Sequence, residues 1–235
     1  MRSTKNLKIL LLTLLIGGIV ACVRTGELRE ETQSVQLGEA KSVEMELEMG
    51  IGELELQGGA RELMEGTFTY NVKRWEPKVV YRVIGDRGML SVNQGKTSGI
   101  PIGNLENRWD ISLSNDVPLD LEVDFGAGDG ELDLRGIILN SLNIDMGVGE
   151  LTLDLSGKRD RNLDITIDGG IGSGTIYLPG DISVRVEIDG GIGSVNAPWM
   201  NKKGNVYTND AYGETDISMD IKIDAGIGSI DLKLK

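Results

Sequence analysis

Residues 167–195 read IDGGIGSGTIYLPGDISVRVEIDGGIGSV, and the phrase IDGGIGS occurs twice in this stretch, with its two starts 21 residues apart. Four related Gly-x-Gly cores occur elsewhere in the chain: MGIG from residue 49, FGAG from 125, MGVG from 146 and AGIG from 225. The intervals between successive cores are 76, 21, 23, 21 and 35 residues. Three successive intervals of such similar length define an internal repeat.

Each repeat unit has a run of alternating apolar and polar residues on either side of its Gly-x-Gly core, such as LNID before and ELTLDL after the core at residue 146. Alternation with a period of two is typical of strands with one buried face. The unit is therefore strand, glycine corner, strand and turn. Units stacked about 4.8 Å apart would share one core. The sequence predicts an all-β fold, a single-chain β-solenoid with two stacked sheets.

The inward positions of the predicted coils are aliphatic. On one sheet we expect Leu142, Ile144, Leu163, Ile165, Ile167, Val184, Val186, Ile188, Ile221 and Ile223, and on the other Leu151, Leu153, Leu155, Ile176, Leu178, Ile230, Leu232 and Leu234. We expect the glycines to recur because every coil turns the same corner, where glycine accepts backbone angles that other residues resist. A phosphate-binding loop is the weaker interpretation, because no helix pattern and no Lys-Ser or Lys-Thr pair follows the glycines.

The regular repeats occupy residues 119–235, and residues 43–118 differ from them. There the alternating runs and the Gly-Asp-Arg-Gly turn at 85–88 predict an antiparallel β-hairpin region that packs on the first coil and closes that end of the stack. The segment 199–214, WMNKKGNVYTNDAYGE, lengthens the last interval, and we expect it to form a protruding loop.

The N-terminus predicts an exported protein. Residues 1–21 combine Arg2, Lys5 and Lys8 with a short apolar run, which is typical of a secretory signal. The following Cys22, the only cysteine, completes a sequence that resembles the lipobox of bacterial lipoproteins. We expect Cys22 to be lipidated and to hold the chain to a membrane, the outer face of the cytoplasmic membrane or an outer membrane where one exists. The alternative is an uncleaved anchor with an incidental cysteine. Residues 22–42 are polar and would serve as a flexible tether.

Composition narrows the function. The chain has 33 Gly, no His and a formal net charge of −13, which becomes −16 when the three cations of the signal are removed. The absence of His removes the usual general base and the commonest zinc ligand. Strong negative charge disfavours nucleic acid as a partner. We therefore expect no nucleic-acid binding and no His-dependent catalysis, whereas carboxylate-pair hydrolysis and oxygen-ligated metals remain open on composition alone.

An acidic residue precedes each glycine corner. In register these residues would form a column of carboxylates: Glu48, Asp124, Asp145, Asp168, Asp189 and Asp224. Each Asp is expected to accept hydrogen bonds from the N–H groups of its own turn. The alternative is a weak Ca²⁺ site at Asp145, Asp168, Asp189 and Asp224, and Ca²⁺ is the only cofactor that the sequence suggests. A catalytic carboxylate pair is a third interpretation.

The stretches VEMELEMGIGELELQGGARELMEGTFTYNV and NRWDISLSNDVPLDLEVDFGAG resemble the toast-rack domain of bacterial envelope proteins. The later GIGS coils resemble LiaF-type stress-response regulators and adhesin-like proteins with head-GIN domains. The resemblance covers roughly residues 35–235 and implies a fold without an agreed enzymatic role. The lipobox stands where LiaF-type proteins have membrane helices.

Taken together, these features predict a non-enzymatic, lipid-anchored interaction or stress-sensing module of the cell envelope, with an envelope protein as its partner. Trp199, Tyr207 and Tyr212 are candidate partner-binding anchors, because aromatic residues dominate interface energetics. The alternative for Trp199 is a cap on the end of the core. An adhesin-like or Ca²⁺- and glycan-binding surface module is the alternative function, and a carboxylate-dependent hydrolase is the third.

Overall fold

The computed structural model of the chain describes residues 23–95 and 101–235. The predicted all-β class is confirmed, because fifteen strands and one short 3₁₀ helix, η1 (Lys73–Trp75), make up the regular structure of these residues. No helix in the described ranges is long and apolar enough to cross a membrane.

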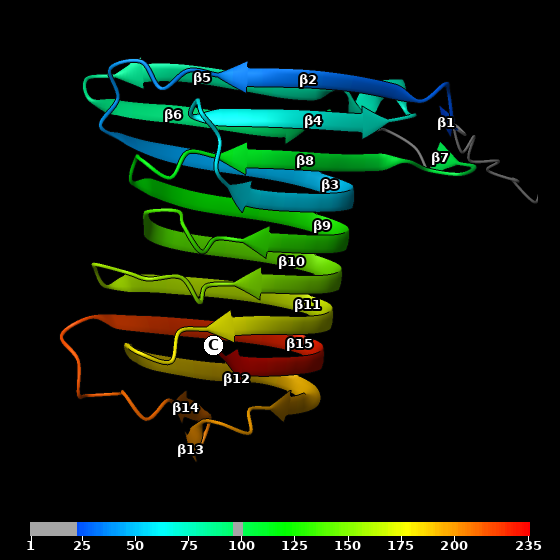
Figure 1. Cartoon of the computed structure of the whole chain (residues 1–235). Helices are drawn as coiled ribbons and strands as arrows, with labels where there is room; N and C mark the ends of the chain where they lie inside the picture. Colours follow the sequence, from blue (N-terminus) through cyan, green and yellow to red (C-terminus); the bar gives the residue numbers. More distant parts are fainter. Residues whose placement is uncertain (1–22, 96–100) are drawn as a thin grey trace, which may run out of the picture.

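Six long strands form the body of the molecule, one for each Gly-x-Gly core: β3 (Ser42–Gly58), β9 (Leu119–Asp133), β10 (Leu139–Asp154), β11 (Leu163–Leu178), β12 (Ser183–Asn196) and β15 (Ser218–Leu234). Each long strand turns back on itself at one side of the molecule, and the strands stack above one another (Figure 1). We name the residues before the glycines the first arm of a strand and those after them the second arm. Hydrogen bonding continues through the bends, so the two predicted sheets are two layers of one folded sheet of 13 strands.

The order of the long strands differs from the order of the repeats in the sequence. They pair in parallel in the order β12-β15-β11-β10-β9-β3, so the C-terminal strand β15 lies between β11 and β12. Figure 1 shows the C-terminus inside the stack and not at its lower end. The expectation that successive coils are neighbours is therefore wrong for the last two. All units carry the same pattern, so either order satisfies the alternation.

Buried aliphatic side chains fill the space between the arms as predicted. Of the expected core positions, Ile188, Ile230 and Leu234 are partly buried and the others are buried. The core continues into β3, where Met45, Leu47, Leu54 and Leu56 are each at most 1% exposed. One contiguous apolar core therefore runs through the whole stack.

The N-terminal end of the stack is closed by mostly antiparallel strands, as predicted. Its strands are β2 (Arg29–Val35), β4 (Met64–Tyr70), β5 (Pro77–Ile84), β6 (Arg87–Gln94) and β8 (Asn107–Leu113), with the short pair β1 (Val23–Arg24) and β7 (Pro101–Ile102) beside them. β5 and β6 form the predicted hairpin at Gly85 and Asp86. The tether prediction for 22–42 is wrong for β2, which pairs with β4 along its whole length. Backbone hydrogen bonds hold this polar strand, so its side chains gave no strand pattern.

The segment 199–214 also differs from its prediction. It holds a small antiparallel hairpin, β13 (Asn201–Lys203) and β14 (Val206–Thr208), and β14 pairs with the first arm of β12. The expected protruding loop therefore covers the free edge of that arm at the lower end of the stack.

Candidate functional site

The glycine corners bring neighbouring strands unusually close together. A Cβ atom added to Gly149 would lie 2.8 Å from the carbonyl carbon of Gly128 and nearer still to its oxygen. The same clash recurs with backbone of the neighbouring strand along two columns, at Gly126, Gly147, Gly170, Gly226 and Gly191, and at Gly128, Gly149, Gly172, Gly228 and Gly193. The glycines repeat because each stands against the backbone of the next strand, in addition to turning a corner.

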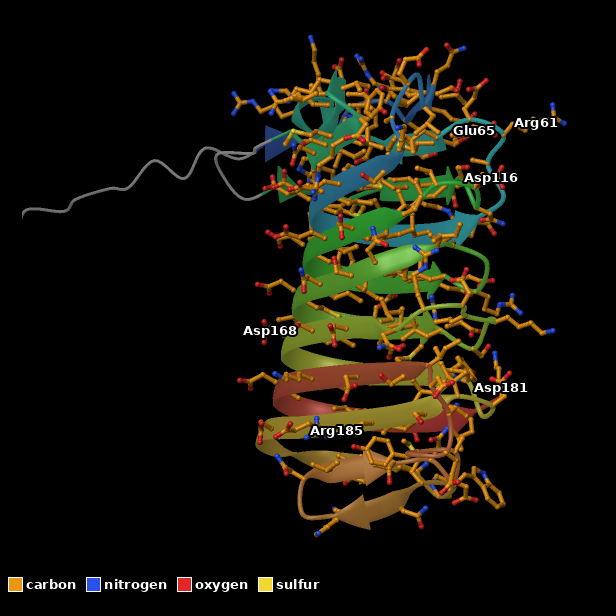
Figure 2. All side chains as sticks on the ribbon, turned by 90° about the vertical axis from the view of Figure 1, so that its left-hand side faces the viewer. Arg61, Glu65, Asp116, Asp168, Asp181 and Arg185 are labelled. Atoms are coloured by element: carbon orange, nitrogen blue, oxygen red, sulfur yellow. The ribbon has the colours of Figure 1, made fainter. Side chains whose placement is uncertain are left out.

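The carboxylate column is in register, with one acid for each long strand. Asp168 is paired in register with Asp145 on one side and Asp224 on the other, and Asp224 is followed by Asp189. Figure 2 shows Asp168 on the outer side of the stack. Partial burial and the neighbouring charges of Asp145 and Glu48 raise the pKa of Asp124 above its usual value.

In the described part of the chain, the acids of this column do not have the expected hydrogen bonds. Among the residues in 23–95 and 101–235, no N–H group of a glycine corner donates to an acid of the column, and Asp189 instead accepts a hydrogen bond of 2.7 Å from Asn205 Nδ2. The acids are mostly solvated, and within the same residues no group of three or more is close enough to hold a metal ion. Ca²⁺ binding at Asp145, Asp168, Asp189 and Asp224 stays a prediction.

The three candidate aromatic anchors lie in different environments. Trp199 is 73% exposed and Tyr212 is 47% exposed, whereas Tyr207 is 5% exposed and belongs to the core. Tyr207 closes the lower end of the first arms, and Lys202 Nζ lies 5.0 Å from the centre of its ring. Trp199 therefore does not cap the core, and Tyr207 performs that role.

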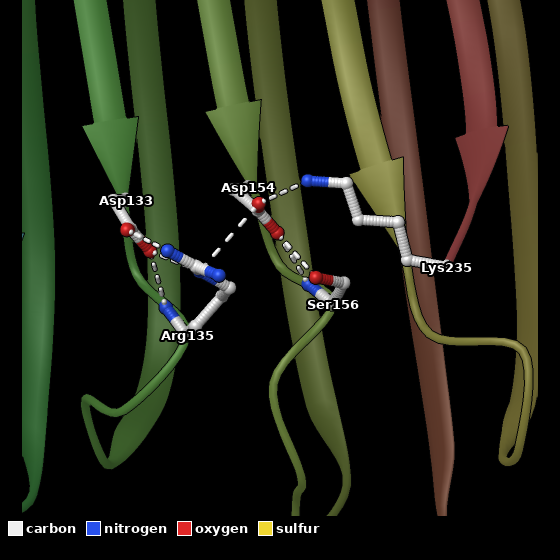
Figure 3. Close-up of polar contacts among 5 residues, drawn as sticks. All are labelled: Asp133, Arg135, Asp154, Ser156 and Lys235. Atoms are coloured by element: carbon white, nitrogen blue, oxygen red, sulfur yellow. Dashed lines mark hydrogen bonds and ion pairs between the residues drawn. The ribbon is translucent and has the colours of Figure 1, made fainter.

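A polar cluster links the end of the C-terminal strand to β10, the strand beyond its neighbour β11 (Figure 3). Lys235 Nζ lies 2.7 Å from Asp154 Oδ2 on β10, and Ser156 donates from its N–H and its hydroxyl to the other oxygen of that carboxylate. Burial acts to raise the pKa of Asp154, but the hydrogen bonds from Lys235 and Ser156 outweigh burial and hold the pKa below its usual value. On the adjacent strand, Arg135 pairs with Asp133 and lowers the pKa of that carboxyl. Lys235 therefore adds a contact with β10 to the strand pairing of β15 with β11 and β12.

The most site-like feature is an apolar cavity between the arms of the four strands β10, β11, β15 and β12. It has a volume of about 360 Å³ and is open to solvent at β12, where the lining residues Gly190 and Ser194 are exposed. At the last inward position of the first arm before the bend, β3, β9 and β10 have the large residues Met49, Phe125 and Met146. The strands β11, β15 and β12 have Gly169, Ala225 and Gly190 at the same register position. On the facing arm, Gly174 stands where β10 has Leu151. The cavity exists because these large side chains are missing.

Sequence reasoning did not identify this cavity. The signal was present, since the residue before the Gly-x-Gly core changes from Met or Phe to Gly or Ala in the last three units. Cys22 lies outside the described residues, so its lipidation stays a prediction.

Comparison with known proteins places this geometry in a family. Residues 24–177 match the model described as the N-terminal domain of toast_rack, and residues 126–232 match the model described as cell wall-active antibiotics response LiaF, C-terminal. No curated protein matches the chain.

One solved structure agrees with this result. A candidate cell adhesion protein from Clostridium sporogenes is 33% identical, covers 89% of this chain and 100% of its own, and has a TM-score of 0.81. A candidate adhesin from Bacteroides fragilis covers 89% of this chain and 99% of its own at 11% identity, but its TM-score of 0.26 is too low to support a structural argument. The family model matches residues 24–177, more than half of the chain, and a 33% identical relative covers 89% of it, so the chain belongs to the toast-rack family.

Proposed function

We propose that this toast-rack protein is a non-enzymatic, lipid-anchored interaction module of the cell envelope. The observation that carries the proposal is the family match over residues 24–177, together with the LiaF-type match that follows it. The sequence around Cys22 adds the expected lipid anchor, because acyl chains on that residue would hold an acidic chain to a membrane that its charge does not favour.

The arrangement of the stack suggests how such a module would present itself. Strand β1 directly follows Cys22 and lies at the upper end in Figure 1, whereas the hairpin β13–β14 lies at the lower end. The main sheet path from β2 to β13 contains 11 strands, and at about 4.8 Å for each spacing it extends about 48 Å. An anchor at Cys22 would therefore direct the lower end away from the membrane.

The lower end carries the exposed aromatic side chains that suit a protein contact. Trp199 is 73% exposed and Tyr212 is 47% exposed, and both belong to the segment that connects β12 with β15. Large aromatic side chains are the commonest energetic anchors of interfaces. We assign the partner contact to these two residues, with an envelope protein as partner.

A non-enzymatic role is supported by the chemistry of the cavity. Asp189 is the only acid among its described lining residues, and Asn205 already binds that carboxylate. Hydrolysis by a carboxylate pair requires two acids that face one reacting bond. Adhesion is the alternative function, and the relative from Clostridium sporogenes described as a candidate cell adhesion protein favours it.

Two experiments test the proposal. First, the Cys22→Ser variant should leave the membrane fraction and become soluble, and a variant that stays with the membrane would contradict the lipid anchor. Second, a photo-crosslinking amino acid at Trp199 or Tyr212 should capture an envelope protein in intact cells. The same group at the exposed Asn143, on the outer face of the first arm of β10, is the control, and equal capture from both places would refute the assigned contact surface.

A further inference from the structure

We propose that the cavity between β10, β11, β15 and β12 binds one unbranched hydrocarbon chain of a single-chain lipid, such as a fatty acid. This inference does not depend on the proposed envelope contact, because it rests on the interior of the stack and not on its outer surface.

The three strands that enclose the cavity with β10 share the same departure from the upper strands. Gly169, Ala225 and Gly190 replace the Met or Phe of the upper strands at one inner position. The positions after their Gly-x-Gly cores are also alike, with Ser173, Ser229 and Ser194 where the upper strands have Glu or Asp. Three strands therefore lose the same filling side chain at one inner position, which produces one continuous channel and not an isolated packing defect.

The dimensions of the channel fit a single methylene chain. From β10 to β12 it passes three strand spacings, or about 14 Å at about 4.8 Å each. With a volume of about 360 Å³, its mean cross-section is about 25 Å². Carbon–carbon contacts of about 4 Å allow one methylene chain in this section and exclude a second. A cavity of less than half this volume, about 150 Å³, is known to bind benzene when its walls are apolar.

The walls have the chemistry of a lipid site. Ile167, Ile176, Ile188, Ile223 and Ile230 line the channel together with glycine backbone. That backbone belongs to paired strands, so its N–H and C=O groups are largely used within the sheet. A peptide in the channel would leave its own polar groups without partners, whereas a hydrocarbon chain has none to satisfy.

The lower end of the channel offers both an entrance and a place for a polar head. The hairpin strand β14 covers residues 185–187 on the first arm of β12, but within the described chain no further strand pairs with the second arm of β12. Lys202, on the hairpin, is the only cation among the described lining residues. A carboxylate or phosphate held by Lys202 would leave its hydrocarbon chain directed upward into the channel.

The cavity can be filled with side chains that the neighbouring strand already uses. A Cβ atom on Gly174 would meet nothing within 4 Å, and one on Gly169 would meet only Asp224 O, at 4.0 Å. The substitutions Gly174→Leu and Gly169→Met copy Leu151 and Met146, their register partners on β10. Both should fill the channel without disturbing the sheet. Thr175→Leu is the matched control, because it adds the same side chain to the opposite face of β11.

The test measures binding of trans-parinaric acid, a fluorescent fatty acid with an unbranched chain, and its displacement by sodium palmitate. It uses the chain from residue 23 onward, which contains every described strand and needs no detergent. We expect saturable binding to the unsubstituted chain and to Thr175→Leu, and at least a tenfold loss of affinity in Gly174→Leu and Gly169→Met. Thermal unfolding at or above the temperature of the unsubstituted chain would show that the two filled variants are folded. No saturable binding, or equal binding by folded filled variants, would overturn the proposal.

Two further measurements locate the head group of the lipid and identify the source of its hydrocarbon chain. Lys202→Met should lower the affinity for palmitate about threefold, as expected for the loss of an exposed ion pair. The affinity for 1-hexadecanol, which has no charge, should not change. An unchanged affinity for palmitate would overturn the assignment of Lys202. Displacement by palmitate alone would identify a free fatty acid, and displacement by 1-palmitoyl-lysophosphatidylglycerol would identify a membrane lipid.

Discussion

Replacing Gly149 with alanine should strongly destabilise the stack. The added Cβ would lie 2.8 Å from the carbonyl carbon and 3.1 Å from the nitrogen of Gly128, and these are backbone atoms that cannot rotate away. Ordinary carbon contacts of 3.5–4.0 Å require β10 to move from β9 by about 1 Å. Ladder hydrogen bonds of normal length would then be lost on that side of the bend.

The magnitude follows from two contributions. Gly149 has φ of 146°, where a residue with a side chain is strained by about 1–3 kcal/mol. One or two weakened hydrogen bonds add about 0.5–1.5 kcal/mol each. We expect a loss of about 1.5–6 kcal/mol in the free energy of unfolding. The middle of this range, about 4 kcal/mol, lowers Tm by about 10 °C for a chain of 235 residues.

Guanidinium chloride unfolding followed by circular dichroism measures this loss, and Gly174→Ala is the matched control. Gly174 lies on the next strand, two residues beyond Gly172, the register partner of Gly149, and a Cβ there meets nothing within 4 Å. The control should be neutral or stabilising by up to about 1 kcal/mol, because alanine reduces the entropy of the unfolded chain. If Gly149→Ala were within about 0.5 kcal/mol of the unsubstituted chain, close strand approach would not be the reason for the repeated glycines.

Three other substitutions test the charges of the stack. Lys235→Met should lower the free energy of unfolding by about 1–2 kcal/mol at neutral pH, because it leaves the buried Asp154 carboxylate with fewer hydrogen-bond donors. Folding lowers the pKa of Asp154, so this loss should be present above the usual pKa of 3.8. It should vanish in unfolding curves measured as the pH falls below 3.8. Asp124→Asn should raise the free energy of unfolding by a few tenths of a kcal/mol at neutral pH. Folding raises the pKa of Asp124, so this gain should disappear at acidic pH and shrink in high salt. A gain in Tm that is the same under all these conditions would contradict repulsion along the carboxylate column. Arg159→Met should raise the free energy of unfolding in urea by about 1–2 kcal/mol. The reason is that the buried Nε and Nη2 of Arg159 have no hydrogen-bond partner and that burial lowers the pKa of this side chain. Arg161→Met, which removes an exposed ion pair, is the control and should change the free energy of unfolding little.

The alternating pattern and the glycine interval were sufficient to predict much of this fold. A period of two requires strands with one buried face, so the positions of Leu142, Ile165 and Leu153 in the core could be assigned from the sequence. The constant spacing between the acid and the glycines fixed the register of the carboxylate column, and Gly85 with Asp86 fixed the hairpin of β5 and β6.

The remaining features depended on tertiary contacts. All repeat units share one pattern, so no local signal tells whether β15 lies beside β11 or at the end of the stack. Its position depends on contacts across the sheet, including that of Lys235 with Asp154. β2 is held by backbone hydrogen bonds and therefore has no apolar pattern to reveal it. The cavity is formed by side chains that Gly169 and Gly174 do not have, and a missing side chain becomes a binding space only when the strands around it are in place.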